Sequence, residues 1–209
     1  MSQAILIEPH YWGSISYFHA LCHAENTTLD LHANFKKGTY RNRCEIMGPN
    51  GMLSLSVPLK KGKDQHTIFD EVRISYTENW RKDHFQSLVS SYRRSAYFEY
   101  YEDAIAPIYE QEFEFLKDLD IATTEVILKL LKQKSEILFT EEYISVGNFA
   151  GKDLREAIHP NASKSSYEIS TVPYQQVFMD RMEFLPNLSI LDLLFNMGPR
   201  ATSFLADSL

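Results

Sequence analysis

TYRNRCEIMGPNGMLSLSVPL, residues 39–59, predicts a β-hairpin, because apolar and polar side chains alternate on both sides of a turn sequence. In the first half, the face toward the core would carry Tyr40, Cys44 and Ile46, and the opposite face Arg41, Arg43 and Glu45. GPNG, residues 48–51, has the composition of a tight turn. In the second half, one apolar face would carry Leu53, Leu55, Val57 and Leu59.

The chain before this hairpin predicts a strand, a helix and a second strand. AILIE, residues 4–8, is a short apolar run of the kind found in buried strands. Residues 14–24 have helical spacing, and residues 27–33 alternate again. A third strand is expected at DEVRISY, residues 70–76, after the lysine-rich loop 60–66.

The rest of the chain is predicted to be mainly helical. Apolar residues three and four apart indicate helices at 79–95, 97–112 and 113–134, with a break or kink at Pro107. Residues 136–145 suit another strand, 147–176 are expected to be irregular, and a last helix would begin at Ser189 and end at Gly198.

These elements predict an α/β fold with a mixed sheet: a strand-helix-strand start, an antiparallel hairpin and a helical C-terminal half. The alternative class is α+β. A length of 209 residues suits one core, so we expect residues 1–209 to form a single domain, with 1–78 mainly sheet and 79–209 mainly helical.

Composition excludes several classes of protein. A net charge of −7 argues against a nucleic-acid partner, which needs a broad basic face. No apolar run approaches the roughly 18 residues of a membrane span, and the start of the chain does not have the pattern of a secretory signal. Cys22 and Cys44 are too few for a disulfide framework, so we expect a soluble cytoplasmic protein.

Common cofactor and metal motifs are missing. The eight glycines form neither a dinucleotide-binding fingerprint nor a phosphate-binding loop, and no zinc signature is present. His19, Cys22 and His23 would share a helical face, with His32 on the next strand. A helix whose thiol packs inward and whose imidazoles lie at the boundary explains the same spacing, so neither a metal nor a cofactor is assigned.

The YRNR segment suggests an anion site. On a strand, Arg41 and Arg43 would lie on one face about 6.5 Å apart, a spacing that suits two guanidinium groups holding one phosphate or carboxylate. The alternative is a solvated face balanced by Glu45. Asn42 would point toward the core, where its amide needs hydrogen-bond partners.

NWRKDHFQSL, residues 79–88, gathers cations at the start of a helix. With Asn79 as N-cap, Arg81 would fall within the apolar face, and Trp80 and His84 would share one edge of it. Cations in a first helical turn are unfavourable unless a negative group is near. That group is either a side chain such as Asp83 or a bound anion, and the sequence leaves both open.

Several blocks together resemble the WbqC-like protein family: YRNRCEI, GPNGMLSLSVPLKKG, ISYTENWRKDHFQSLVSSYRRSAYFEYYED and the terminal PNLSILDLLFNMGP. They occur in the family's order over nearly the whole chain. The start departs from the family pattern. Glu8 stands in EPHYWGSISYF where glutamine is usual, and LDLHANF carries one acidic residue where the family has paired aspartates.

The resemblance implies a transferase of bacterial surface polysaccharide and O-antigen biosynthesis, with acyl or aminoacyl transfer to an amino sugar. The substrate would be a small phosphate-bearing molecule, either a nucleotide sugar or a carrier-bound acyl group. The alternative is a non-catalytic protein that binds or assembles a phosphate-bearing glycan intermediate. His84 is expected as general base beside Tyr11 and Glu8. The expected substrate-binding residues are Arg41, Asn42, Arg43, Trp80 and Arg81.

Overall fold

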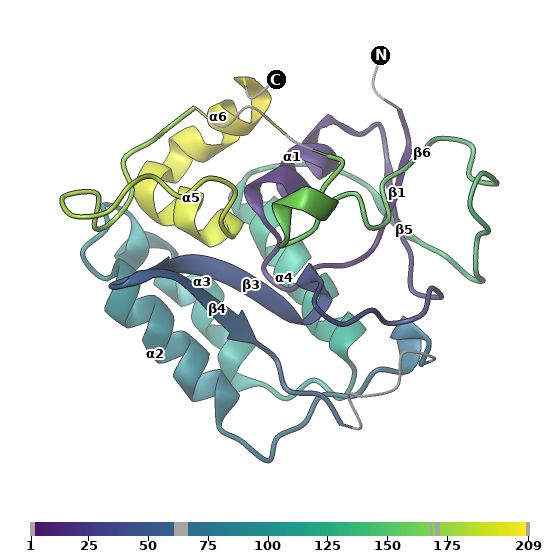
Figure 1. Cartoon of the computed structure of the whole chain (residues 1–209), viewed down its shortest axis with the longest axis horizontal. Coiled ribbons are helices and arrows are strands. Elements are labelled where there is room, and N and C mark those ends of the chain that lie inside the picture. The colour runs from purple at the N-terminus through teal and green to yellow at the C-terminus, as the bar shows by residue number, and fades with distance from the viewer. Residues whose placement is uncertain (1–2, 61–66, 168, 170–171, 208–209) are drawn as a thin grey trace.

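The two strands of the predicted strand-helix-strand start belong to a four-stranded parallel sheet. The computed structural model describes residues 3–60, 67–167, 169 and 172–207. The strands are β1 (Ile5–Ile7), β2 (Thr27–Leu29), β5 (Ile137–Phe139) and β6 (Lys152–Asp153). They pair in the order β5-β2-β1-β6, all parallel (Figure 1). The predicted lysine-rich loop falls mostly on residues 61–66, outside the described residues.

Helix α1 (Ile15–His23) connects β1 to β2 as predicted. Ser14 caps it, because its hydroxyl accepts a hydrogen bond from the Tyr17 amide at 3.4 Å. Such a helical crossover is what two adjacent parallel strands require. The strand-helix-strand prediction is therefore confirmed.

The hairpin is confirmed with one correction. Strands β3 (Arg43–Gly48) and β4 (Gly51–Ser56) pair antiparallel, and Cys44 and Ile46 are buried. Residues Tyr40–Asn42, however, form a 3₁₀ turn. Arg41 and Arg43 therefore do not share the face of a strand, and the prediction of a two-arginine strand face is wrong.

The predicted third strand is also wrong. Residues Phe69–Glu71 form a 3₁₀ turn, and the chain after it makes only isolated bridges, Leu59 with Ile74 and Arg73 with Phe115. Val72 and Ile74 are buried, which explains the apolar alternation. The Ile74 amide donates to the Glu114 carbonyl, and the Val72 carbonyl accepts from the Leu116 amide. Bonds of Arg73 and Ser75 to Lys60 and Pro58 make a single bridge after β4, not a ladder with the hairpin.

The predicted helical half is confirmed. It contains α2 (Trp80–Tyr92), α3 (Phe98–Glu110), α4 (Leu116–Leu130) and α5 (Ile190–Met197). Pro107 lies inside α3 on its exposed side and does not end it. Ser189 caps α5 and Gly198 ends it with φ 57°, as expected. Helix α6 (Ala201–Asp207) and the short strand β6 were not predicted from the sequence.

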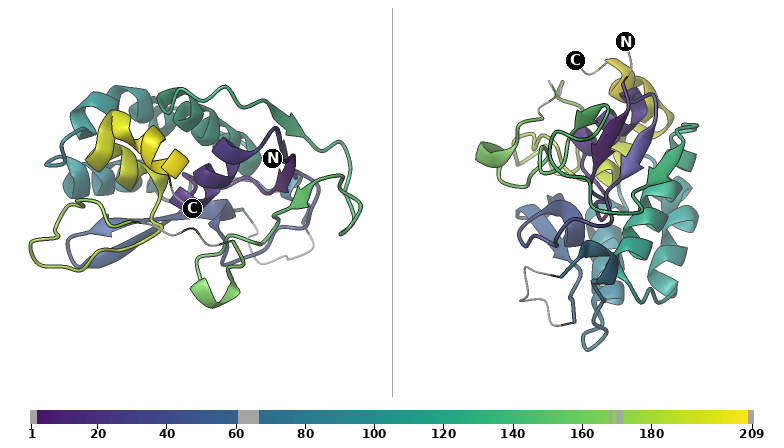
Figure 2. Two further views of the ribbon diagram at one scale, coloured as in Figure 1. Left: turned by 90° about the horizontal axis from the view of Figure 1, so that it is seen from above. Right: turned by 90° about the vertical axis from the view of Figure 1, so that its right-hand side faces the viewer.

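Packing places the elements around one apolar core. Helix α3 packs between α2 and α4, the hairpin packs on α2 and α5, and α1 packs on α5 and α6. Figures 1 and 2 place the parallel sheet at one end of the long axis and residues 174–185 at the other. Among the described residues, no helix has the length and apolar character needed to cross a bilayer.

Candidate functional site at the carboxyl edge of the parallel sheet

Each strand of the parallel sheet delivers a polar side chain to the same edge. Glu8, Asp30 and Thr140 directly follow β1, β2 and β5, and Asp153 is the last residue of β6. The first three are buried. Because all four strands run in one direction, these side chains meet at the carboxyl edge, where open α/β sheets usually bind ligands.

A cleft of about 440 Å³ lies at this edge, within the roughly 300 to 1,000 Å³ common for small-molecule sites. Its lining is Ala33, Lys36, Arg41, Tyr143, Val146, Asp153, Arg155 and Glu156. Three cations, two carboxylates and one aromatic ring thus surround it. The Arg155 guanidinium carbon lies 5.7 Å from the centre of the Tyr143 ring.

Arg155 joins the strand ends into one network. Its Nη1 donates to Asp30 Oδ2 at 2.9 Å and to the Ile144 carbonyl at 2.7 Å, and its Nε donates to Asp153 Oδ1 at 2.9 Å. Asp30 also accepts backbone bonds from His32 and Ala33. Both carboxylates are fixed by several donors, so this wall of the cleft is preorganised.

Glu8 is an ionised carboxylate beneath the cleft. Both its oxygens accept hydrogen bonds from the Glu156 amide, at 3.1 and 2.9 Å. Burial alone would raise its pKa, but Arg41 at 3.8 Å and His10 at 3.7 Å outweigh burial and lower the pKa to about 2. Burial lowers the pKa of His10, so the nearby imidazole is neutral at neutral pH.

Arg41 forms the floor of the cleft. It is 1% exposed, and its Nε and Nη1 have no hydrogen-bond partner among the described residues. The Asp120 carboxylate is buried as well, and burial raises its pKa well above 3.8 although Arg41 opposes this. Arg41 is therefore a buried cation with unused donors, a costly arrangement for a purely structural group.

One residue that lines the cleft, Glu156, has a strained backbone. Glu156, whose amide donates to Glu8, has φ 63°, and Trp12, which follows the 8–11 segment, has φ 43°. Side chains other than glycine rarely adopt this left-handed region. Strain of this kind is concentrated at functional sites in many proteins.

Tyr11 and His84, both from the predicted set, form a second group that does not line the cleft. The Tyr11 hydroxyl lies 3.0 Å from His84 Nδ1 and donates to the Tyr109 hydroxyl at 3.3 Å. The Trp80 ring meets His84 edge-on, with centroids 5.2 Å apart. Burial lowers the pKa of His84 to about 4 and raises that of Tyr11 well above 10, so both are neutral at neutral pH.

The R-N-R segment connects these two groups. Arg41 faces Glu8, while the Asn42 side-chain amide donates to the Val57 carbonyl at 3.0 Å, which supplies a partner for that amide. Arg43 pairs with Ser56, whose carbonyl favours the protonated form of His84. The segment therefore runs from the cleft floor to the neighbourhood of His84.

Arg81 does not join either group. It donates to the carbonyls of Glu110 and Gln111, at 3.3 and 2.8 Å, and to the Glu112 carboxylate at 2.9 Å. Its guanidinium carbon also lies 5.1 Å from the Tyr76 ring centre. The side chain thus caps the C-terminal end of α3 instead of pointing into the apolar face of α2, and that part of the prediction is wrong.

The histidine cluster near α1 has other partners. His19 Nδ1 lies 2.8 Å from the Tyr167 hydroxyl, and His23 Nδ1 lies 2.9 Å from the His19 carbonyl. Within the described part of the chain, no group of three or more His, Cys, Asp or Glu side chains is arranged to hold a metal ion. The residues at the sheet edge also form no such group.

The family model described as "WbqC-like protein family" matches residues 8–167, more than half of the chain. The chain belongs to the WbqC-like protein family. It is also 25% identical to "Uncharacterized protein Rv1507c" of Mycobacterium tuberculosis over 232 aligned positions, which cover 98% of each chain. No solved structure matches it.

The WbqC-like match contains every residue that lines the sheet-edge cleft, from Ala33 to Glu156, and it begins at Glu8. Three residues of the candidate site were not predicted as site residues from the sequence: Asp30, Asp153 and Arg155. Asp30 was expected inside the strand predicted at 27–33, whereas it directly follows β2, which ends at Leu29. Arg155 carried no local signal, since its contact with Asp30 spans 125 residues.

Proposed function

We propose that this WbqC-like protein is a transferase that acts on a small phosphate-bearing molecule in the sheet-edge cleft. The observation that carries the proposal is the convergence of four strand ends on a cleft whose floor is the buried Arg41. A preformed polar crevice with an aromatic wall suits a sugar phosphate. Lys36, Arg41 and Arg155 would hold the phosphate, and Tyr143 would pack on the sugar.

Family membership suggests the reaction: acyl or aminoacyl transfer to an amino sugar in bacterial surface polysaccharide or O-antigen biosynthesis. In this reaction the amine nitrogen attacks the acyl carbonyl carbon, and a C–N amide bond forms. The bond from that carbon to the leaving group breaks, and the amine gives up one proton to a base. Two unpaired cysteines, Cys22 and Cys44, support a cytoplasmic site for this step.

We assign the proton-transfer roles to Glu8, Tyr11 and His84. Glu8 is ionised and lies next to the cleft floor, so it can orient an amine. His84 is neutral and lies 3.0 Å from the Tyr11 hydroxyl. It can accept the Tyr11 proton once that hydroxyl turns its hydrogen bond from Tyr109 to His84 Nδ1. Trp80 would hold this group in place through its ring contacts with Tyr11 and His84, while Asn42 and Arg43 would fix the hairpin beside it through Val57 and Ser56.

Turnover of amino-sugar phosphates tests this assignment. The wild-type protein is incubated with a panel of amino sugar 1-phosphates and nucleotide-linked amino sugars, each with an acyl-coenzyme A donor, and amide products are detected by mass spectrometry. Tyr11→Phe keeps the ring and removes the hydroxyl. We expect its kcat to fall by about 10²- to 10⁴-fold while KM changes little. An unchanged kcat contradicts the proposed role of Tyr11 and His84.

The second candidate is a non-catalytic binding or assembly protein with the same cleft. The hydrogen bonds from Arg155 to Asp30 and Asp153 favour this binding role. Carboxylates fixed in this way can shape a ligand site without taking part in chemistry. A panel that yields no amide product, while one sugar phosphate raises the melting temperature of the wild-type protein but not of Lys36→Gln, supports this candidate against the transferase.

A further inference from the structure

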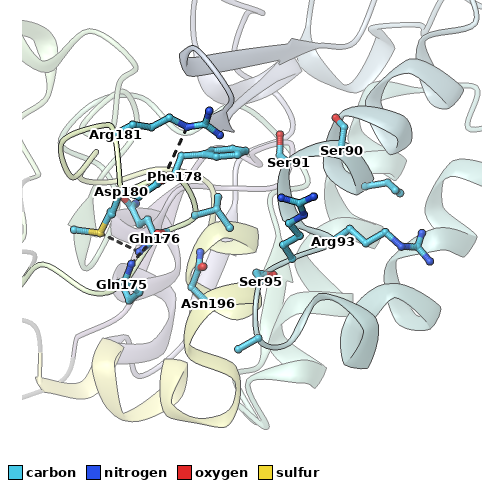
Figure 3. A pocket seen from close by; sticks show the side chains of 15 residues that line it. Ser90, Ser91, Arg93, Ser95, Gln175, Gln176, Phe178, Asp180, Arg181 and Asn196 are labelled. Carbon is cyan, nitrogen blue, oxygen red and sulfur yellow. Dashed lines mark hydrogen bonds and ion pairs between the residues drawn. The ribbon is translucent and has the colours of Figure 1, made fainter.

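A second and larger cavity lies at the other end of the molecule. Its volume is about 730 Å³, and it lies between the C-terminal part of α2, the turn to α3, the 175–181 segment and Asn196 of α5 (Figure 3). Figures 1 and 2 show residues 174–185 at the end of the long axis opposite the parallel sheet. This cavity is therefore separate from the sheet-edge cleft.

The lining of this cavity is positively charged in an acidic protein. Arg93, Arg94 and Arg181 line it together with one carboxylate, Asp180. Asp180 Oδ1 lies 3.9 Å from Arg181 Nε. Among the described residues, no carboxylate pairs with Arg93 or Arg94. Although the whole chain carries a net charge of −7, this local excess of cations favours anions at the cavity.

Phe178 gives the cavity a flat apolar surface. Figure 3 shows its ring extending from the 175–181 segment toward Ser91 of α2. The Arg181 guanidinium carbon lies 4.9 Å from the ring centre. Phe178 has φ 65°, a conformation that costs energy for a bulky side chain and is retained where the surrounding structure requires it.

The polar groups of the cavity are partly unused and partly rigid. Ser91 is 3% exposed, and its hydroxyl has no partner among the described residues. Gln176, by contrast, donates to Asp192 Oδ2 at 2.9 Å and to the Leu185 carbonyl at 2.9 Å. The Tyr92 hydroxyl donates to the same aspartate at 2.8 Å. The 175–181 segment is thus tied to α2 and α5, and the cavity is preformed.

We propose that this cavity binds a nucleoside diphosphate. Arg94 and Arg181 would hold the diphosphate, Phe178 would stack on the base, and Ser91 would accept or donate one hydrogen bond. The site does not use the sheet-edge cleft and does not depend on the proposed transferase reaction. Its 175–181 segment and Asn196 lie beyond the residues that the family model matches.

Calorimetric titration of the wild-type protein with UDP, GDP and ADP, and separately with pyrophosphate and inorganic phosphate, tests the proposal. We expect at least one nucleoside diphosphate to bind about tenfold or more tightly than pyrophosphate, because the base adds a stacked contact. Affinity should fall as salt is raised. Absence of binding by all three nucleotides, or equal affinity for pyrophosphate, overturns the assignment.

Substitutions inside and outside the cavity locate the binding. Arg94→Gln combined with Arg181→Gln should weaken nucleotide binding by about tenfold or more, and Phe178→Leu should weaken nucleotide but not pyrophosphate binding. Arg200→Gln is the control, since Arg200 is exposed and does not line the cavity. Equal weakening by Arg200→Gln indicates non-specific attraction and overturns the site.

Discussion

In the folded state, Arg41 and His10 stabilise the negative charge of Glu8. Its pKa is lowered to about 2 from 4.5, so ionisation favours the folded protein. For a lowered pKa, this stabilisation is complete above about pH 4.5 and is lost as the pH falls toward 2. We expect Glu8→Gln to remove this part of the acid dependence, as measured by urea unfolding across that pH range.

The same substitution leaves Arg41 buried without its carboxylate. Removing one member of a buried ion pair costs about 3 to 5 kcal/mol, so the free energy of unfolding of Glu8→Gln should fall by that amount at neutral pH. Glu45→Gln is the control, because Glu45 is only partly buried, lies on the hairpin and accepts a hydrogen bond from Tyr40. Parallel acid profiles for Glu8→Gln and the wild type contradict the assigned pKa.

Arg81 holds the end of α3 by hydrogen bonds. It donates to two carbonyls at the end of α3 and to Glu112, so Arg81→Gln should lower the free energy of unfolding by about 1 to 2 kcal/mol. Lys82→Gln, an exposed neighbour on the same helix, should change it by less than about 0.5 kcal/mol. Urea unfolding compares the two. Equal effects show that Arg81 does not cap α3.

At the scale of elements, the end of α5 depends on a glycine. Gly198 has φ 57°, and a Cβ there would lie 2.5 Å from the Tyr97 ring. Gly147 also has a positive φ, 86°, but no atom lies near its added Cβ. Gly147→Ala should therefore cost about 1 to 2 kcal/mol from the backbone alone, and Gly198→Ala clearly more. Thermal unfolding measures both, and equal losses contradict the packing of Tyr97 on this turn.

Elements were predictable from the sequence where their signal is local. The hairpin, the strand-helix-strand start and the main helices follow from periodicity over ten to twenty residues. The third strand failed because burial of Val72 and Ile74 produces alternation without a partner strand. Strand β6 has two residues and carries no periodic signal at all.

The sequence predicted only part of the candidate site, because much of the site depends on how distant segments pack together. Glu8, Tyr11 and His84 were identified, and the structure brings Tyr11 and His84 into contact. Arg41 was expected on a strand face, yet it turns inward to Glu8 because residues 40–42 form a 3₁₀ turn. A cleft built from strand ends that are far apart in the chain depends on sheet order, which no local pattern specifies.

At the scale of the whole molecule, we propose that residues 1–209 fold as one domain. Buried apolar residues from Ile5 to Leu205 belong to one cluster, which supports this proposal. Calorimetric unfolding should then show one transition whose calorimetric and van't Hoff enthalpies agree. Two separable transitions, one of them insensitive to Gly198→Ala, contradict it.

We propose that the sheet-edge cleft binds a phosphate-bearing amino sugar, and calorimetric titration with a panel of amino sugar phosphates measures this binding. Lys36→Gln and Tyr143→Ala change exposed side chains of the cleft and should weaken binding by about tenfold or more. Lys37→Gln and Tyr100→Ala change exposed residues outside it and should leave the affinity within about twofold. Absence of binding across the panel, or unchanged affinity in both cleft variants, contradicts ligand binding at the sheet edge.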